Sequence, residues 1–195
     1  MEANILFAIQ SLRSPFCDLL FRGFTYLGDG GIFWIVVSVI FLTKKETRYV
    51  GLTMLIAAAI SGAVAQLLCK PLFNRTRPYI VYKQPILIPP PRGTSFPSGH
   101  TAVAFAVAWT YFVLYRNRKR WVFLAVAAGI AFSRMYLFVH YPSDVAVGIG
   151  VGIAMSYAAR GLMDRLLAHH PASWTWLDGV ARPAPAIPEG AVAKD

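Results

Sequence analysis

The stretch SFPSGHT, residues 95–101, places a proline, two serines, a glycine and a histidine directly before the apolar run AVAFAVAW. Pro97, Ser98 and Gly99 are typical of a helix start, which places His100 in the first turn. Free backbone N–H groups and the positive end of the helix dipole make such a turn an anion site. Taken alone, the stretch also fits an ordinary helix cap beside an uninvolved histidine.

Further polar residues stand at the ends of apolar runs or inside them. Arg134 interrupts an apolar helix, where an arginine is costly in lipid and needs a polar cavity. His140 follows six residues later, and Asp144 four residues after that. Lys70 ends an apolar run in CKPLFNRTRPY, and Arg77 lies seven residues beyond it. Each residue has an ordinary interpretation, such as snorkelling or contact with lipid phosphate, but their placement on one side of the membrane favours a common site.

The elements that must position these residues are membrane helices. Of the 195 residues, 56% are hydrophobic and 14% are charged, which is too apolar for a soluble domain of this length. The net charge of +10 does not indicate nucleic acid, because the cations lie at the ends of apolar runs, as membrane topology and anionic lipid require. We expect no nucleic-acid partner and no removable signal peptide. Cys17 and Cys69 permit one disulfide at most, and we expect both to be small buried residues.

The apolar runs predict an all-α fold, a polytopic bundle of five or six transmembrane helices. Because a crossing takes about 20 helical residues, the first and third runs are short unless their flanks join the helix. Two runs carry a small residue at every fourth position, which predicts close helix packing. The runs are 31–43, 49–69, 101–115, 121–139 and 145–167, and the small residues are Ala57, Ser61 and Ala65, then Gly148, Gly152 and Ser156.

The chain divides into three parts. In residues 1–27, apolar stretches are broken by charges, which predicts one or two amphipathic helices in the membrane interface, with a sixth, broken span as the alternative. Residues 28–167 form the membrane domain. Residues 168–195 turn to alanine, proline, glycine and scattered charges, which predicts a flexible cytoplasmic tail.

The spans alternate in direction, so the polar segments before residue 31, at 70–100 and at 134–144 share one side of the membrane. The raw count of Lys and Arg does not decide the orientation. This side carries eight Lys and Arg residues and the other side carries nine. If Lys70, Arg77 and Arg134 are excluded because they serve a site, five remain on this side. The side with nine is then cytoplasmic, and the site lies outside the cytoplasm. The eight are Arg13, Arg22, Lys70, Arg75, Arg77, Lys83, Arg92 and Arg134; the nine are Lys44, Lys45, Arg48, Arg116, Arg118, Lys119, Arg120, Arg160 and Arg165.

Three motifs together resemble the signature of the type-2 phosphatidic acid phosphatase superfamily. This superfamily includes lipid phosphate phosphatases, undecaprenyl diphosphate phosphatases and vanadium haloperoxidases. The motifs stand in the superfamily's order within residues 25–167. They are Lys70-x6-Arg77-Pro78, Pro97-Ser98-Gly99-His100 and Ser133-Arg134-x5-His140-x3-Asp144.

The resemblance implies a phosphate-binding role for five motif residues. Lys70, Arg77 and Arg134 bind the phosphoryl oxygens, Arg in a bidentate manner and Lys as a point charge. Ser98 and the backbone N–H of Gly99 complete the phosphate site. Because three cations already balance the phosphate charge, the set implies no metal and no cofactor.

The resemblance also implies three catalytic residues. His140 attacks phosphorus and forms a phosphohistidine, while Asp144 holds the other ring nitrogen and fixes the tautomer. His100 protonates the leaving oxygen and then deprotonates the water that releases phosphate. Two other classes share part of the pattern. A transporter of anionic lipid needs cations but no such His–Asp pair, and a haloperoxidase usually has a soluble helical domain.

The loop between Arg77 and Pro97 bears on the substrate. It carries Lys83 and Arg92 and no acidic residue, and Arg75 adds a third cation outside the motifs. These cations suit a second phosphate or, alternatively, anionic head groups. We therefore expect a cell-membrane enzyme that converts undecaprenyl diphosphate to undecaprenyl phosphate, with phosphatidic acid or phosphatidylglycerol phosphate as alternatives. The expected partners are a lipid phosphate substrate and membrane lipids, and the sequence indicates no oligomeric state.

Overall fold

The computed structural model describes residues 1–115, 117–169, 176 and 180, and within these residues the regular elements are helices. The predicted all-α class is thus confirmed, whereas most of the predicted tail, 168–195, lies outside the described residues. The helices are α1 (Glu2–Gln10), α2 (Pro15–Gly28), α3 (Ile32–Leu42), α4 (Arg48–Ala63), α5 (Lys70–Phe73), α6 (Pro78–Val81), α7 (Gly99–Leu114), α8 (Lys119–Tyr136) and α9 (Pro142–His169), with shorter segments η1 (Asp29–Gly31), η2 (Lys45–Thr47) and η3 (Val64–Cys69).

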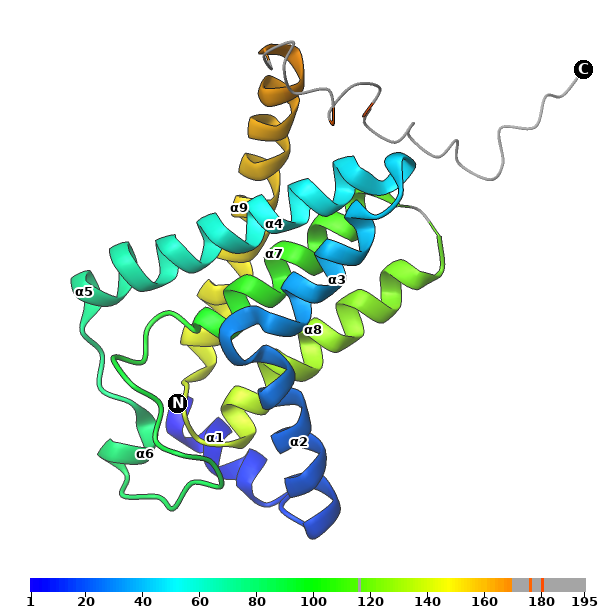
Figure 1. Ribbon diagram of the computed structural model, residues 1–195. Coiled ribbons are helices and arrows are strands. Elements are labelled where there is room, and N and C mark those ends of the chain that lie inside the picture. The colour runs from blue at the N-terminus through cyan, green and yellow to red at the C-terminus, as the bar shows by residue number, and fades with distance from the viewer. Residues whose placement is uncertain (116, 170–175, 177–179, 181–195) are drawn as a thin grey trace, which may run out of the picture.

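The helix α7 is at the centre of the bundle. It packs against α4, α8 and α9, which surround it in Figure 1. Its sequence is apolar on every face, and a helix of that kind is buried on all sides. Around it the core combines small residues of α7 with large side chains from its neighbours, among them Trp34, Tyr49, Met54, Ile130 and Met163.

Close packing of α9 on α7 depends on two glycines. A Cβ on Gly148 would lie 2.8 Å from the backbone oxygen of Ser98, and a Cβ on Gly152 would lie 2.5 Å from that of Ala102. Both distances are too short for any residue with a side chain. Ser156, the third residue of the same face, is buried and accepts a hydrogen bond from Thr110 at 2.9 Å. The predicted close packing is therefore confirmed for Gly148, Gly152 and Ser156, and it fixes the start of α9 beside the start of α7.

Helices longer than the predicted runs supply the membrane-crossing length. The stretches Pro15–Leu42, Lys45–Val81 and Pro142–His169 are long and apolar enough to cross a membrane, and Gly99–Leu114 is a shorter apolar helix. The first of these joins α2 to α3 through η1, where Gly30 and Gly31 have φ values of 59° and 69°. The predicted run 31–43 thus gains length from its flank. The location of residues 1–27 in the membrane interface stays a prediction.

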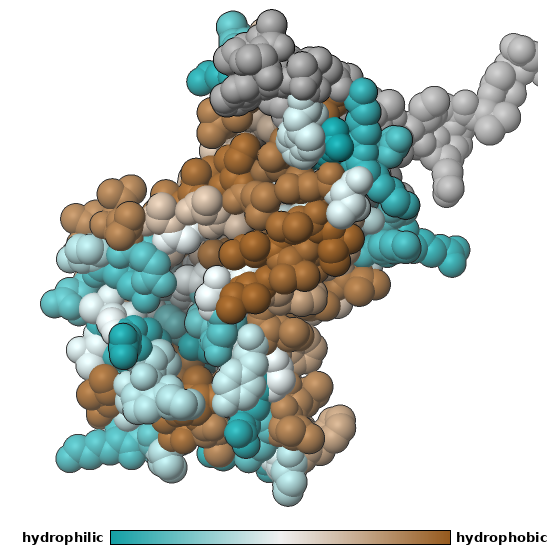
Figure 2. All heavy atoms as spheres, viewed as in Figure 1, coloured by the Kyte–Doolittle hydropathy of each residue, from teal (hydrophilic) through white to brown (hydrophobic). Residues whose placement is uncertain are grey.

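The surface supports burial in lipid. Figure 2 shows an apolar region across the middle of the molecule, with hydrophilic side chains on either side of it. Large apolar side chains are exposed along α3, at Ile32, Ile35, Val36, Val39 and Ile40. A continuous apolar face of this kind is unfavourable in water and favourable in a bilayer.

The expected burial of both cysteines is wrong. Cys17 and Cys69 are unpaired and only partly buried. Cys17 lies on the rim of a small apolar cluster, and Cys69 follows the exposed Leu67 and Leu68 in η3. Large apolar side chains are exposed on the outside of this bundle, so an apolar sequence context does not predict burial there.

Candidate active site

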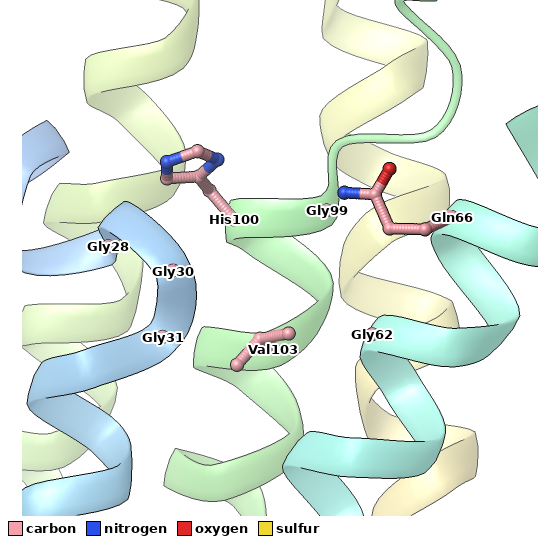
Figure 3. Close-up of a pocket in the computed structure, with 8 residues that line it drawn as sticks. All are labelled: Gly28, Gly30, Gly31, Gly62, Gln66, Gly99, His100 and Val103. Atoms are coloured by element: carbon pink, nitrogen blue, oxygen red, sulfur yellow. The ribbon is translucent and has the colours of Figure 1, made fainter. Parts of the chain in front are cut away.

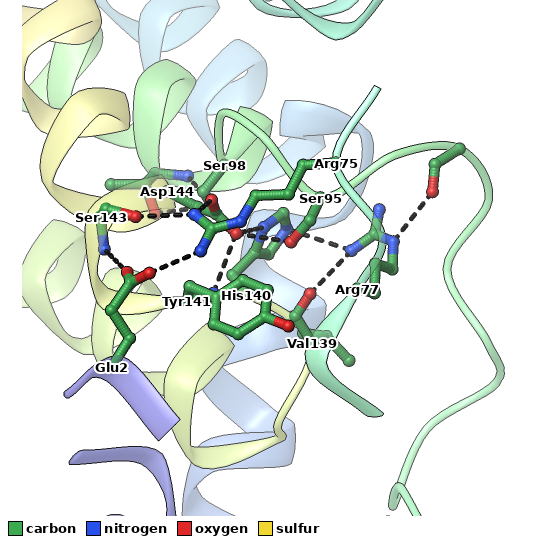
Figure 4. Close-up of polar contacts among 12 residues, drawn as sticks. Glu2, Arg75, Arg77, Ser95, Ser98, Val139, His140, Tyr141, Ser143 and Asp144 are labelled. Atoms are coloured by element: carbon green, nitrogen blue, oxygen red, sulfur yellow. Dashed lines mark hydrogen bonds and ion pairs between the residues drawn. The ribbon is translucent and has the colours of Figure 1, made fainter. Parts of the chain in front are cut away.

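The predicted site residues lie at one end of the bundle. Lys70 starts α5 at the end of the long α4 stretch, Arg77 precedes α6, and Ser98 caps α7. The turn between α8 and α9 carries His140 to the same end, where Figure 4 shows it beside Asp144 and Arg77. Residues as far apart in the sequence as Lys70 and Asp144, which are separated by 74 positions, thus lie at the same end of the bundle.

The turn after α8 positions the histidine. The backbone N–H groups of Val139 and His140 both donate to the carbonyl oxygen of Arg134, at 3.1 and 3.2 Å. Phe138 has a φ of 58°, a left-handed conformation that is unfavourable for a bulky residue and is found where surrounding structure enforces it. The turn therefore reverses the chain within a few residues and directs His140 inward, where its side chain is 2% exposed.

The contacts of His140 define its tautomer. The Nη1 atom of Arg77 lies 3.2 Å from Nε2 of His140. Because arginine only donates hydrogen bonds, Nε2 is the acceptor and the ring proton is on Nδ1. Nδ1 faces Oδ2 of Asp144 at 3.5 Å, a contact too long for a strong hydrogen bond, and has no other partner among the described residues. This is the tautomer that the predicted nucleophile requires.

The charge state of His140 follows from its surroundings. Burial lowers the pKa of His140 below its usual 6.5. Asp144 opposes this change, and the positive charges of Arg134 and Arg77 add to it. The imidazole is therefore neutral at physiological pH, with a lone pair on Nε2.

Asp144 is held by three hydrogen bonds besides the contact with His140. Its Oδ2 accepts from the hydroxyl of Ser95 at 2.5 Å and from the backbone N–H of Tyr141 at 2.9 Å. Its Oδ1 accepts from Nη1 of Arg75 at 2.7 Å. The carboxylate is fully buried, and because both of its oxygens are engaged, its orientation toward His140 is fixed.

Arg77 connects the long loop to the α8–α9 turn. Its guanidinium donates to the carbonyl oxygens of Gly93, Arg92 and Val139 at 3.0, 3.1 and 3.1 Å. The side chain is almost completely buried. Arg77 thus holds the loop against the turn and also contacts Nε2 of His140.

His100 and Arg134 share a neighbouring pocket of about 280 Å³. The Nε2 atom of His100 lies 2.7 Å from Oδ1 of Asp29 in η1. Since a carboxylate only accepts, Nε2 carries a proton, and Nδ1 takes no part in this contact. Burial lowers the pKa of His100 and the charge of Arg134 lowers it further, whereas Asp29 opposes this change. Arg134 donates from Nη1 to the hydroxyl of Thr25, while its buried Nε has no partner among the described residues. That N–H is free to bind a phosphoryl oxygen.

Lys70 lines a second, wider pocket of about 410 Å³ together with Arg92. The π-helical segment η3 immediately precedes Lys70, and such segments are frequent at functional sites. Ser98, another of the predicted phosphate ligands, has its hydroxyl engaged within its own helix. Its hydroxyl lies 2.8 Å from Oγ1 of Thr101 and accepts from the Thr101 backbone N–H, so it caps α7. The phosphate-binding roles of all five predicted ligands, Lys70, Arg77, Ser98, Gly99 and Arg134, stay predictions.

Three contributions to the site were not foreseen from the sequence. Asp29 pairs with His100, Ser95 binds Asp144, and Arg75 binds Asp144 rather than facing the pocket of Lys70. An acid in the glycine-rich turn YLGDGG, beside an apolar run, was the available indication for Asp29. Among the described residues, no three His, Cys, Asp or Glu side chains lie together in a way that could hold a metal ion, and metal-free chemistry stays a prediction.

Comparison with known families decides the assignment. The profile described as the PAP2 superfamily matches residues 47–167, which contain all three motifs. The chain belongs to the PAP2 superfamily. The resemblance predicted from the motifs is therefore confirmed, and membership favours a hydrolase over the transporter alternative.

Similar proteins refine the assignment. A lipid A 4′-phosphatase of Porphyromonas gingivalis is 26% identical over 170 residues, which are 80% of this chain and 70% of that protein. The undecaprenyl-diphosphatase BcrC of Bacillus subtilis is 32% identical over 116 residues, 59% of this chain and 56% of that protein. The crystal structure of Aquifex aeolicus LpxE covers 81% of this chain and 93% of its own, with 28% identity and a TM-score of 0.65. This PAP2 protein is thus a membrane lipid phosphatase.

Proposed function

We propose that this PAP2 protein removes the terminal phosphate of a lipid phosphate or diphosphate through a phosphohistidine on His140. The observation that carries this proposal is the position of Nε2, a neutral acceptor 3.2 Å from the Arg77 guanidinium, with the protonated Nδ1 facing Asp144. A nucleophile needs this lone pair, and an arginine beside it places a phosphoryl oxygen next to the attacking atom.

In the first step, Lys70, Arg77 and Arg134 neutralise the phosphoryl oxygens. Nε2 of His140 attacks phosphorus, and the bond from phosphorus to the leaving oxygen breaks; this oxygen stays on the lipid alcohol of a monophosphate or on the remaining phosphate of a diphosphate. The leaving oxygen takes a proton from His100, whose charged form the negative substrate phosphate favours. The ring of His140 becomes cationic, and Asp144 stabilises it through Nδ1–H.

In the second step, water attacks the phosphohistidine. His100, now neutral, takes a proton from this water, the bond between nitrogen and phosphorus breaks, and phosphate leaves. His140 returns to its neutral tautomer and His100 to its protonated form, so the protons balance over one cycle. Asp29 keeps the proton on Nε2 of His100 in both steps, which leaves Nδ1 to exchange protons with the leaving oxygen and then with water.

The lipid chain has a place on the leaving-group side. A groove of about 240 Å³ lies between η1, α4 and the start of α7, and His100 projects at its edge (Figure 3). Five of its eight lining residues are glycines, so few side chains line it. The hydrocarbon chain of the leaving group, attached to the oxygen that His100 protonates directly in a monophosphate or through the remaining phosphate in a diphosphate, would enter this groove. The lining residues are Gly28, Gly30, Gly31, Gly62, Gln66, Gly99, His100 and Val103.

We favour a polyprenyl diphosphate such as undecaprenyl diphosphate as the substrate, with the site facing the outside of the cell membrane. A second phosphate needs cations beyond the motif, and Arg92 lines the wide pocket beside Lys70. The structure offers fewer extra cations for a second phosphate than the sequence suggested. Arg75 is bound to Asp144, and the side chain of Lys83 is exposed on the loop. Similarity to BcrC supports the same choice.

Lipid A, which would lose a phosphate, is the second candidate substrate. The P. gingivalis lipid A 4′-phosphatase aligns with 80% of this chain, against 59% for BcrC. A sugar phosphate also fits the open pocket of about 410 Å³ beside Lys70.

A substrate comparison on purified protein in one detergent tests the proposal. We expect undecaprenyl diphosphate to be turned over faster than lipid A, phosphatidic acid and phosphatidylglycerol phosphate. Arg92→Gln should lower turnover of the diphosphate relative to the monophosphates, whereas Lys83→Gln should leave the ratio unchanged. Faster turnover of lipid A would favour the second candidate, and no release of phosphate from any of the four would contradict the proposed function.

A further inference from the structure

We propose that Glu2 and Arg75 are positioning residues for the nucleophile, acting through Asp144, so that the N-terminal helix α1 is part of the active site. The proposal rests on the proposed role of His140. Arg75 stands at one of the unspecified positions of the first motif, and Glu2 is the first residue of α1, outside all three motifs.

Arg75, which lies between α5 and α6, binds residues of α1 and of α9. Its Nη1 donates to Oδ1 of Asp144 and to the hydroxyl of Ser143, each at 2.7 Å. Its Nη2 donates to Oε2 of Glu2 at 2.5 Å. The guanidinium also stacks on the ring of Tyr141, with Cζ 3.8 Å from the ring centroid. Figure 4 shows Arg75 between Glu2 and Asp144, with Arg77 on the other side of His140.

Glu2 fixes both Arg75 and the start of α9. Besides binding Arg75, it accepts a hydrogen bond through Oε1 from the backbone N–H of Ser143 at 3.0 Å. That N–H is among the first of α9 and has no partner within the helix. Glu2 therefore caps the helix on which Asp144 stands and at the same time anchors the cation that holds Asp144.

This arrangement determines how Asp144 meets His140. Oδ1 faces Arg75, and Oδ2 faces the ring of His140, so Arg75 lies on the far side of the carboxylate from the nucleophile. Without Arg75 the carboxylate would lose the contact on Oδ1 that opposes its rotation. A small displacement of an orienting group is enough to slow a reaction strongly.

The charges follow the same logic. A guanidinium alone against Asp144 would weaken the negative charge that stabilises the imidazolium of His140. Arg75 is paired with Glu2 as well as with Asp144. The three side chains together therefore carry a net charge of −1. The arrangement orients Asp144 without cancelling its charge.

The alternative role for Arg75 is a ligand of a second phosphate, and kinetics separate the two. The variants are Arg75→Gln, Arg75→Lys and Glu2→Gln, and the control is Arg13→Gln, which breaks a surface ion pair to Asp18 at 3.1 Å. Each is assayed with undecaprenyl diphosphate and with phosphatidic acid. A double variant, Arg75→Gln with Asp144→Asn, is measured beside the single variants.

If the proposal is right, Arg75→Gln lowers kcat by about 10²-fold on both substrates, the size of effect expected from a misplaced orienting group, while KM stays nearly unchanged. Arg75→Lys recovers part of the loss. Glu2→Gln lowers kcat by about two- to fivefold, because the Glu2–Arg75 ion pair is partly exposed to solvent. Arg13→Gln leaves kcat unchanged. The double variant loses little more than Asp144→Asn alone, because both changes act on one unit.

Two results would overturn the proposal. One is a rise in KM confined to the diphosphate, which would make Arg75 a phosphate ligand. The other is full additivity in the double variant. If Arg75→Gln fails to fold, Glu2→Gln still decides, since an unchanged kcat in that variant contradicts the proposal. Failure of the proposed function is recognised separately, because His140→Ala would then retain activity.

Discussion

Arg77 donates a hydrogen bond at 3.2 Å to the nitrogen of His140 that we propose as the nucleophile. The lone pair of this nitrogen is therefore engaged by a cation. In the proposed mechanism, a phosphoryl oxygen that accepts from Arg77 would free this lone pair and lie beside it. Substrate binding would then also activate the nucleophile.

Replacing Arg77 should consequently affect both binding and chemistry. Arg77→Gln should lower kcat/KM by about 10²- to 10³-fold, the range for removing one donor to a transition-state oxyanion. Arg77→Lys should also have a lowered kcat/KM. An ammonium group lacks the planar set of donors with which a guanidinium can bind the loop carbonyls and a phosphate together. Steady-state kinetics check this, with the exposed Lys83→Gln as the control. Wild-type kcat/KM in Arg77→Lys would contradict the bridging role.

The pair of Asp29 and His100 predicts a dependence on the leaving group. Asp29→Asn should slow hydrolysis of a lipid phosphate by about 10²-fold, as expected for a poorly oriented general acid. An aryl phosphate, whose leaving oxygen needs no proton, should form the phosphoenzyme at nearly the wild-type rate. Rapid-quench measurement of both substrates makes the comparison. An equal loss of the first step with both substrates would show that Asp29 acts otherwise.

The groove beside His100 predicts a chain-length effect. A Cβ on Gly62 would lie 3.7 Å from Val103, an ordinary contact, so a larger residue there fills the groove without disturbing the helix backbone. Gly62→Leu should raise KM for a long-chain lipid and leave a water-soluble short-chain phosphate unaffected. Gly150→Leu is the matched control, since nothing lies within 4 Å of a Cβ at that exposed position. Equal effects of Gly62→Leu on both substrates would contradict the placement of the chain.

The ionisation of Glu2 predicts a dependence of stability on pH. Burial opposes its ionisation, but hydrogen bonds from Ser143 and Arg75 outweigh this and lower the pKa of Glu2 below its usual 4.5. The unfolded chain therefore binds the proton more readily, so the stabilisation is complete above about pH 4.5 and is lost as the pH falls through the lower, folded value. Thermal unfolding of wild type and Glu2→Gln should differ above this range and converge below it. A difference that grows toward low pH would contradict the assignment.

The sequence predicted those parts of the site whose determinants are local. His140 and Asp144 are separated by four residues at one helix start, and Ser98 carries the pattern of a helix cap, so spacing alone indicated their arrangement. The pairing of Asp29 with His100 spans 71 residues and needs η1 to approach α7. Arg75 looked like a phosphate ligand because its neighbours are cations, and its acidic partner Glu2 lies 73 residues away.

The fold shows the same division. Apolar runs predicted the membrane helices, but the charges in residues 1–27 concealed the continuation of α2 into α3. Asp18 is paired with Arg13 at 3.1 Å and accepts from the hydroxyl of Tyr136 at 2.6 Å. These partners compensate its charge, and Tyr136 belongs to α8, which only the tertiary structure brings close.

The most direct test of the account is to trap the phosphoenzyme. Protein mixed with a ³²P-labelled lipid phosphate and quenched within one turnover should carry label that is stable to base, labile to acid and located by peptide mapping on His140. His140→Ala should carry no label, and Asp144→Asn should form it slowly. Single-turnover formation of product without any labelled protein, or label on another residue, would contradict the proposal that His140 is the nucleophile.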